Sequence, residues 1–97
     1  MIGCEDNDIQ SFADVLTIIS QVNRLQIICL LNKEWELSVC EIFEALGLKQ
    51  NLASHHLNLL KNIWLLTTRR DGKKIFYSLE KKAYQDLKSK FTYIFSI

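Results

Sequence analysis

The stretch SVCEIFEALGLKQNLASHHLNLLKN, residues 38–62, contains two short helical patterns separated by a turn. Ser38 and Glu41 have the S-x-x-E spacing of a capping box, in which the hydroxyl accepts a hydrogen bond from a helix amide and the carboxylate reaches back to the cap. The first helix then covers residues 39–46 and ends at Gly47, because glycine most easily adopts a left-handed cap. Two short helices joined by a turn of about three or four residues that contains glycine are typical of a helix-turn-helix.

The second helix of this pair, about residues 50–62, has an apolar side and a polar side. The polar side is a continuous stripe made of Asn51, Ser54, His55, Asn58, Lys61 and Asn62. Amides, a hydroxyl and an imidazole can read base edges in the major groove of DNA, and the stripe contains no acidic residue. We therefore favour contact with DNA over plain solvent exposure for His55.

The adjacent histidines raise the question of a metal site. On a helix His55 and His56 point about 100° apart, whereas paired ligands on one helix normally lie at i, i+3 or i+4. His56 falls on the apolar side, where a packed histidine with one satisfied nitrogen is the better interpretation. The pair is a poor site for a single metal ion.

After the second helix the pattern changes to short β-prone runs. LLTTRR (65–70) and KIFYSL (74–79) flank the sequence Asp71-Gly72-Lys73, which is a strong hairpin signal. Four cations surround the tip: Arg69, Arg70, Lys73 and Lys74. Such a ribbon suits contact with DNA phosphates, and an arginine could enter a minor groove. The alternative, charges that protect strand edges, explains two of the four more easily than the cluster.

Helical patterns also begin and end the chain. Residues 9–20 place apolar side chains at helical spacing, and a following helix, NRLQIICLLN (23–32), is expected to point Leu25, Ile28, Cys29 and Leu31 inward. KEWEL (33–37) is a connector that could form a small strand. The aromatic stripe of the last helix, about residues 80–95, is more apolar than so small a core needs. We expect the first and last helices to form a dimer interface through Phe12, Leu16, Ile19, Tyr84, Leu87, Phe91, Ile94 and Phe95.

Length and charge fit one small domain over residues 1–97 with a polyanionic partner. The 97 residues are 48% hydrophobic, and their net charge of +1 hides a strong asymmetry. Residues 1–23 contain four acidic and no basic side chains, whereas residues 45–82 contain eight lysines and arginines against two acids.

The three cysteines, Cys4, Cys29 and Cys40, include no CxxC pair. With no signal peptide and no run of about 18 apolar residues, we expect a reduced cytoplasmic chain that does not interact with membranes. We interpret Cys29 as a small buried hydrophobe. Cys40 is the better reactive thiol, because a helix N-terminus favours the thiolate.

Three segments in order, NRLQIICLL (23–31), the stretch from ELSVCE to SHHLNLLKN (36–62) and TTRRDGKKIFYSL (67–79), resemble the ArsR/SmtB family of transcriptional repressors. The resemblance covers about residues 11–80. It implies a winged helix-turn-helix homodimer, mainly α with a small β-hairpin in the order α-α-(β)-α-α-β-β-α. Such a dimer would bind an inverted-repeat operator and repress transcription, and in this family DNA affinity commonly falls when an effector binds.

The functional positions of the family carry over unevenly. The residues that match its usual DNA-facing positions are Gln50, Ser54 and His55 on the helix and Arg69, Arg70 and Lys73 on the wing. The departures are Lys49 and Asn51, where the family often has serine and proline, and Trp64, where it usually has glycine.

The effector site is the weakest part of the resemblance. Metal-sensing members often carry Cys-x-Cys where this chain has Ser38-Val39-Cys40, and some recruit an N-terminal cysteine, which would be Cys4. Two thiolates are few for a soft metal, which usually takes three or four ligands. The last helix lacks the histidines of the family's other common metal site, and it lacks a cysteine that could pair with Cys29. We therefore name Cys4 and Cys40 as candidate effector thiols, for a thiol-reactive compound or a thiol-bound metal or metalloid, and assign no metal site.

The sequence thus predicts a DNA-binding repressor and not an enzyme, with double-stranded operator DNA and a second copy of itself as partners. Four alternatives stay open. The first two are a constitutive DNA-binding protein without an effector and a winged helix used for protein contact. The third is a metal-storage module that uses Cys4 and Cys40. The fourth, an enzyme that uses His55 or Cys40, lacks a Ser/His/Asp order and a phosphate-binding glycine loop.

Overall fold

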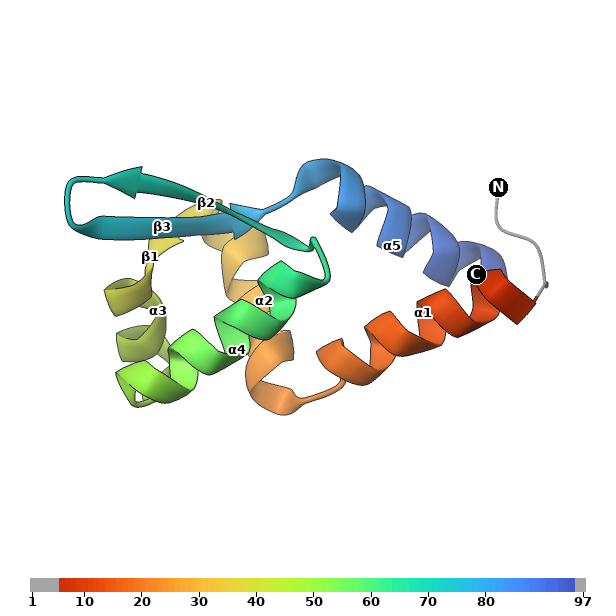
Figure 1. Cartoon of the computed structure of the whole chain (residues 1–97), viewed down its shortest axis with the longest axis horizontal. Helices are drawn as coiled ribbons and strands as arrows, with labels where there is room; N and C mark the ends of the chain where they lie inside the picture. The colour runs from red at the N-terminus through yellow and green to blue at the C-terminus, as the bar shows by residue number, and fades with distance from the viewer. Residues whose placement is uncertain (1–5, 96–97) are drawn as a thin grey trace.

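The computed structural model describes residues 6–95, with side chains from residue 9 onward. In chain order the elements are α1 (Asp6–Ile19), α2 (Val22–Glu34), β1 (Glu36–Ser38), α3 (Val39–Leu46), α4 (Gln50–Asn62), β2 (Leu66–Asp71), β3 (Lys74–Leu79) and α5 (Lys81–Phe95). The molecule measures 44 × 22 × 22 Å, with the sheet, α2, α3 and α4 at one end and α1 and α5 extending to the other (Figure 1). This arrangement confirms the predicted order of elements, including the small strand in the KEWEL connector.

The helix-turn-helix consists of α3 and α4 and begins at the predicted capping box. The Glu41 amide donates to Ser38 Oγ at 3.2 Å, and the Ser38 amide donates to Glu41 Oε1 at 2.9 Å. This second hydrogen bond holds the pKa of Glu41 below its usual value. Helix α3 ends at Gly47, whose φ of 66° is left-handed. Both predicted helix boundaries are therefore confirmed.

The three strands form one antiparallel sheet in the order β1-β3-β2. Asp71 pairs with Lys74, so that Gly72 and Lys73 form a two-residue hairpin turn, with a φ of 64° at Gly72. Strand β1 pairs with β3 from Glu36 to Ser38 and thereby joins the start of the helix-turn-helix to the hairpin. The hairpin, β2 and β3 with their turn, is hereafter called the wing.

The core lies between α2, α3, α4 and the inner face of the sheet. Its most completely buried side chains are Ile27, Leu31, Ile42, Leu57 and Leu60. The predicted inward face of α2 is wrong in part, because Ile28 and Leu31 are buried but Leu25 is 48% exposed and Cys29 is exposed. Leu25 and Cys29 lie one helical turn apart, on the side of α2 away from Ile27 and Leu31. The run LQIICLL is apolar except at Gln26 and fits two rotations of the helix, of which the one that buries Ile27, Ile28 and Leu31 is observed.

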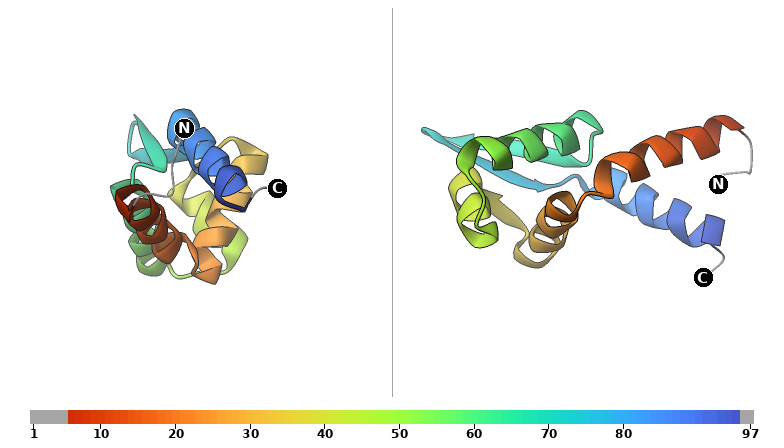
Figure 2. Two further views of the ribbon diagram at one scale, coloured as in Figure 1. Left: turned by 90° about the vertical axis from the view of Figure 1, so that its right-hand side faces the viewer. Right: turned by 90° about the horizontal axis from the view of Figure 1, so that it is seen from below.

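Helices α1 and α5 lie side by side at the far end of the molecule, with a wide separation between their ribbons (Figure 2). Helix α5 buries none of its residues, and its aromatic side chains Phe91, Tyr93 and Phe95 are exposed. None of the described helices is by itself long and apolar enough to cross a membrane. Helices α1 and α2 reach that length and hydropathy only as a pair bent by 93°.

Both tryptophans have positive φ angles, which side chains with a Cβ rarely adopt. At the end of α4 the Trp64 amide donates to the Lys61 carbonyl and the Leu65 amide to the Leu60 carbonyl. Two equivalent hydrogen bonds follow α3, where Gly47 is the left-handed residue. Trp64 therefore occupies a Schellman cap, a conformation that glycine adopts without strain, and its side chain is 80% exposed.

Candidate nucleic-acid interface

The polar stripe of α4 lies on the side of the helix that faces solvent. The core side of α4 is fixed by four buried residues, Ala53, His56, Leu57 and Leu60. The opposite side is exposed at Gln50, Asn51, His55, Asn58 and Lys61, with Ser54 half-buried. Leu52 is also exposed, because it lies at the edge of the buried arc. The structure thus leaves the stripe free to contact a partner along the helix.

A groove runs between the helix-turn-helix and the wing. Its lining includes Cys40 of α3, Gln50, Ser54 and Asn58 of α4, and Lys73 and Lys74 of the wing. Hydrogen-bonding groups of α4 and lysines separated from them by more than a dozen residues therefore share one surface. Amides and a hydroxyl beside two ammonium groups are the chemistry that binds base edges and neighbouring phosphates.

The two arginines of the wing point to opposite faces of the sheet. Arg70 pairs with Ile75, and the register places it on the face that carries the buried Tyr77, toward the helices. Arg69 pairs with Phe76 on the outer face, where its guanidinium lies 4.6 Å from the ring centroid. Although the sequence predicts the same role for both arginines, only Arg70 lies on the strand face that carries Ile75 and Tyr77, two residues that line the groove.

Arg69 is also held by a carboxylate from the opposite edge strand. Its Nη2 donates to Glu36 Oε1 at 2.8 Å and its Nε to Glu36 Oε2 at 3.2 Å. The hydrogen bond from Arg69 lowers the pKa of Glu36, and the same bond raises the pKa of the guanidinium. This is the one ion pair between side chains of residues 9–95, and it partly neutralises Arg69. Sequence reasoning missed it, because Glu36 and Arg69 become neighbours only across β3.

The two histidines have different environments, as the sequence predicts. His55 is exposed, whereas His56 is 5% exposed and accepts a hydrogen bond at Nδ1 from Arg24 Nε at 3.1 Å. Burial lowers the pKa of His56, and the nearby charges of Arg24 and His55 lower it further. His56 Nε2 is buried and has no hydrogen-bond partner among the residues that the structure describes. The interpretation of His56 as a packed histidine with one satisfied nitrogen is confirmed. Its hydrogen-bond partner, Arg24, could not be predicted, because it lies 32 residues earlier in the chain.

The cysteines do not assemble a metal site within the part of the chain that the structure describes. No three side chains among His, Cys, Asp and Glu of the described residues are placed to hold one ion. Cys40 is exposed in the first turn of α3, Cys29 is exposed on α2, and Cys4 lies outside the described residues. The prediction that Cys29 is a buried hydrophobe is therefore wrong, and the described donors do not fit a soft metal that needs three or four ligands.

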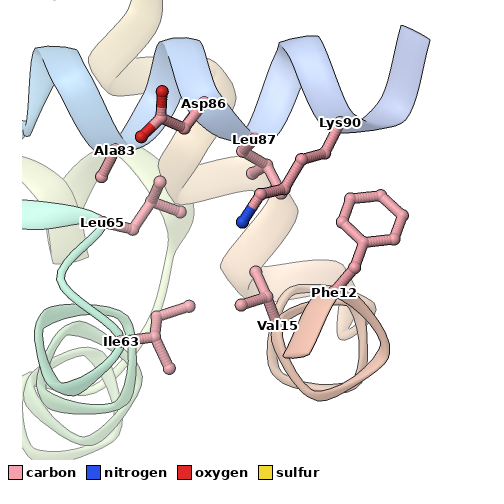
Figure 3. Close-up of a pocket in the computed structure, with 8 residues that line it drawn as sticks. All are labelled: Phe12, Val15, Ile63, Leu65, Ala83, Asp86, Leu87 and Lys90. Carbon is pink, nitrogen blue, oxygen red and sulfur yellow. The ribbon is translucent and has the colours of Figure 1, made fainter. Parts of the chain in front are cut away.

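The residues predicted to form a dimer interface have different environments in the single chain. Phe12 is buried at 4% exposure, whereas Phe91 and Phe95 are exposed and the other five are half-buried. Between α1 and α5 a cavity is lined by the apolar side chains of Phe12, Val15, Ile63, Leu65, Ala83 and Leu87 and by Asp86 and Lys90, and the Lys90 side chain reaches from α5 toward Val15 (Figure 3). Val22, Leu25 and Cys29 add an exposed strip on α2, of which Leu25 and Cys29 were predicted to point inward.

Together, the capped helix pair, the exposed polar stripe of α4 and the basic hairpin define a winged helix-turn-helix. Residues 21–63 match the family model described as "Bacterial regulatory protein, arsR family". The chain is 35% identical over 78 residues to the arsenical resistance operon repressor of Staphylococcus aureus, covering 80% of this chain and 74% of that protein. This chain belongs to the arsR family of regulatory proteins, which confirms the resemblance inferred from its sequence.

Two further comparisons agree with this assignment. The cadmium resistance transcriptional regulatory protein CadC homolog of Staphylococcus aureus is 36% identical over 78 residues, which are 80% of this chain and 64% of that protein. The solved structure of HlyU from Vibrio cholerae superposes with a TM-score of 0.78 at 27% identity, covering 96% of this chain and 100% of that one. The chain thus spans less than two thirds of the length of the CadC homolog, although it covers the whole of the HlyU structure.

Proposed function

We propose that this chain is a transcriptional repressor that binds double-stranded DNA through α4 and the wing. The observation that carries the proposal is the groove in which Ser54 and Asn58 of α4 lie beside Lys73 and Lys74. In a winged-helix complex α4 would enter the major groove and the wing would follow the neighbouring backbone.

The residues divide into two roles by chemistry. Sequence readout is assigned to the exposed polar groups of the reading helix, Gln50, Asn51, Ser54, His55, Asn58 and Lys61. Phosphate contact is assigned to the cations of the wing that lack a carboxylate partner within residues 9–95, Arg70, Lys73 and Lys74. Arg69 is assigned a lesser part, because Glu36 already occupies its guanidinium.

A second copy of the chain is the proposed protein partner. Helix α5 leaves Phe91, Tyr93 and Phe95 exposed, and α2 leaves Val22 and Leu25 exposed. A partner that covers these side chains would remove a large apolar area from water, at about 25 cal/mol per Å². Two copies related by a two-fold axis would present two α4 helices to half-sites about one helical turn or a small multiple apart, which matches an inverted-repeat operator.

The effector, where one acts, is proposed to be thiol-directed and to act at Cys40. Cys40 lines the same groove as Gln50, Ser54 and Lys74, so a group attached to its sulfur would stand where DNA is proposed to bind. The names of two relatives refer to cadmium and to arsenical resistance, and both elements favour thiolates. Because the described donors alone do not form a metal site, Cys4 is the proposed second thiol.

The test is a selection of bound fragments from random duplex DNA, with protein alone and then with cadmium, arsenite or a thiol oxidant. An inverted repeat enriched by the untreated protein supports the repressor. Its loss on treatment, and its persistence when Cys40→Ser is treated, would assign the effector to Cys40, with Cys29→Ser as the matched control. A repeat that resists every treatment would indicate a constitutive DNA-binding protein.

Loss of enrichment in Ser54→Ala and His55→Ala, but not in the control Gln26→Ala on the exposed side of α2, would identify α4 as the reader. No enrichment with untreated protein would contradict DNA recognition and favour the alternative of a winged helix used for protein contact.

A further inference from the structure

We propose that Arg24 is a positioning residue for sequence readout, because its guanidinium ties the buried side of the reading helix α4 to the end of α1. Arg24 itself lies on α2 and faces away from the proposed DNA surface, so it would act through His56 and not by touching DNA. The inference rests on the proposed function, in which α4 reads the operator.

The hydrogen bonds of Arg24 connect three helices at one point. Its backbone amide donates to the Gln21 side chain at 3.1 Å, which caps the start of α2. Its Nη1 donates to the Ile18 carbonyl at 2.9 Å, and its Nε donates to His56 Nδ1 at 3.1 Å. The Ile18 carbonyl belongs to the last turn of α1, where carbonyls have no donor within their own helix. The fork of one arginine therefore satisfies an α1 group and an α4 group simultaneously.

The bond to His56 constrains how α4 is turned about its own axis. His56 is almost fully buried, and within the described residues the bond from Arg24 is the hydrogen bond its ring makes. Acceptance at Nδ1 fixes the neutral tautomer with the proton on Nε2. His56 directly follows Ser54 and His55 along the helix. A rotation of α4 that moved these two readers relative to the wing would break the bond from Arg24.

Lysine cannot replace arginine in this role. An ammonium group on a flexible stem can donate to one of the two acceptors, but it lacks the planar fork that reaches both. Arg24→Lys therefore keeps the charge and most of the packing while it releases either α1 or α4. A purely structural role for Arg24 would predict a lower free energy of unfolding and an unchanged preference for operator over other DNA in the molecules that remain folded.

The binding test compares operator DNA with a scrambled duplex by fluorescence anisotropy. For Arg24→Lys and Arg24→Gln we expect operator affinity to fall about tenfold, as for loss of a hydrogen bond to a buried partner, while affinity for the scrambled duplex changes by less than about twofold. His56→Asn, whose amide oxygen can take the place of Nδ1, should bind like the wild type. The matched control is Lys33→Gln, which removes a positive charge from the exposed last turn of α2.

An independent readout comes from the imidazole ¹⁵N signals of His56 in the free protein. Arg24 from α2 and His55 from α4 are the charged or titratable groups that act on this ring. We expect Nδ1 to be unprotonated and hydrogen-bonded in the wild type, and the titration midpoint of His56 to move upward in Arg24→Gln. Unchanged Nδ1 signals in Arg24→Gln would overturn the proposal.

The outcomes separate this inference from the proposed function. If the wild type does not distinguish operator from scrambled DNA, or Ser54→Ala and His55→Ala leave that ratio unchanged, the reader assignment fails whatever Arg24 does. If those variants lower the ratio and both Arg24 variants leave it unchanged, the positioning role is refuted. Should the Arg24 variants not fold, His56→Leu carries the test, and a folded His56→Leu with wild-type discrimination would refute the role equally.

Discussion

Replacing Arg70 with alanine should weaken binding to every DNA sequence by a similar factor and flatten the dependence of affinity on salt. Arg70 lies opposite Ile75, on the helix-facing side of the wing, and no carboxylate of residues 9–95 pairs with it. It is therefore available to a phosphate. A phosphate contact supplies affinity without base specificity, because the backbone is the same for every sequence.

The magnitude follows from counterion release. Each phosphate neutralised contributes about 0.9 to the slope of log affinity against log salt. The proposed homodimer would present two wings, so Arg70→Ala should reduce the slope by about 1.8. Raising the salt concentration from about 50 to about 200 mM should therefore reduce the ratio of wild-type to variant affinity roughly twelvefold.

The matched control is the adjacent arginine. Arg69 points to the outer face and is held by Glu36, so Arg69→Ala should change the slope much less than Arg70→Ala. Glu36→Gln weakens the hold on Arg69 and should move the slope in the opposite direction, toward stronger salt dependence. Anisotropy titrations at four salt concentrations, with operator and scrambled duplexes, measure all three. The assignment of the two faces would be refuted if Arg69→Ala reduced the salt slope and Arg70→Ala left it at the wild-type value.

Four further predictions concern stability and assembly. Trp64→Gly should raise the free energy of unfolding in urea by up to about 1 kcal/mol, because relief of the left-handed strain exceeds the entropy cost of glycine. Gly47→Ala should lower the free energy of unfolding. A destabilised Trp64→Gly would contradict the argument. Ser38→Ala should cost about 1 kcal/mol through loss of the helix cap. Because the pKa of Glu41 is lowered on folding, its contribution to stability is present above pH 4.5 and is lost as the pH falls through the folded pKa. Glu41→Gln should therefore flatten the fall in stability at acid pH. An equal fall in stability at acid pH in both proteins would exclude this contribution. Phe95→Glu should shift the protein from dimer to monomer in sedimentation and weaken operator binding, and an unchanged dimer would remove α5 from the interface.

Much of the fold could be predicted because its decisive signals are local. The capping box at Ser38, the stop at Gly47 and the hairpin turn at Gly72 each need only a few neighbouring residues. The polar stripe of α4 follows from helical periodicity alone. The candidate site can be proposed from sequence to the same extent, because its polar groups lie on one helix and its cations on the hairpin that follows.

The errors and omissions come from contacts between distant parts of the chain. Alternation along β2 already requires Arg69 and Arg70 to face opposite sides, but the choice between the sides depends on pairing with β3. The Glu36 partner of Arg69 depends in turn on β1 joining the same sheet. The rotation of α2 was ambiguous because its apolar run continues past one face, so Cys29 could be placed inward or outward by periodicity.

Correcting the rotation of α2 changes how binding and assembly are connected. With Leu25 and Cys29 outside, α2 has an apolar side for a partner and, at Arg24, a hydrogen bond to the reading helix. The same guanidinium donates to the Ile18 carbonyl at the end of α1, a helix that the sequence predicts to lie in the dimer interface. A partner that moved α1 would pull on the group that sets the rotation of α4. Operator discrimination should therefore fall in a monomeric variant by more than the loss of the second half-site explains, and a single half-site duplex compared with its scrambled form would measure that excess directly.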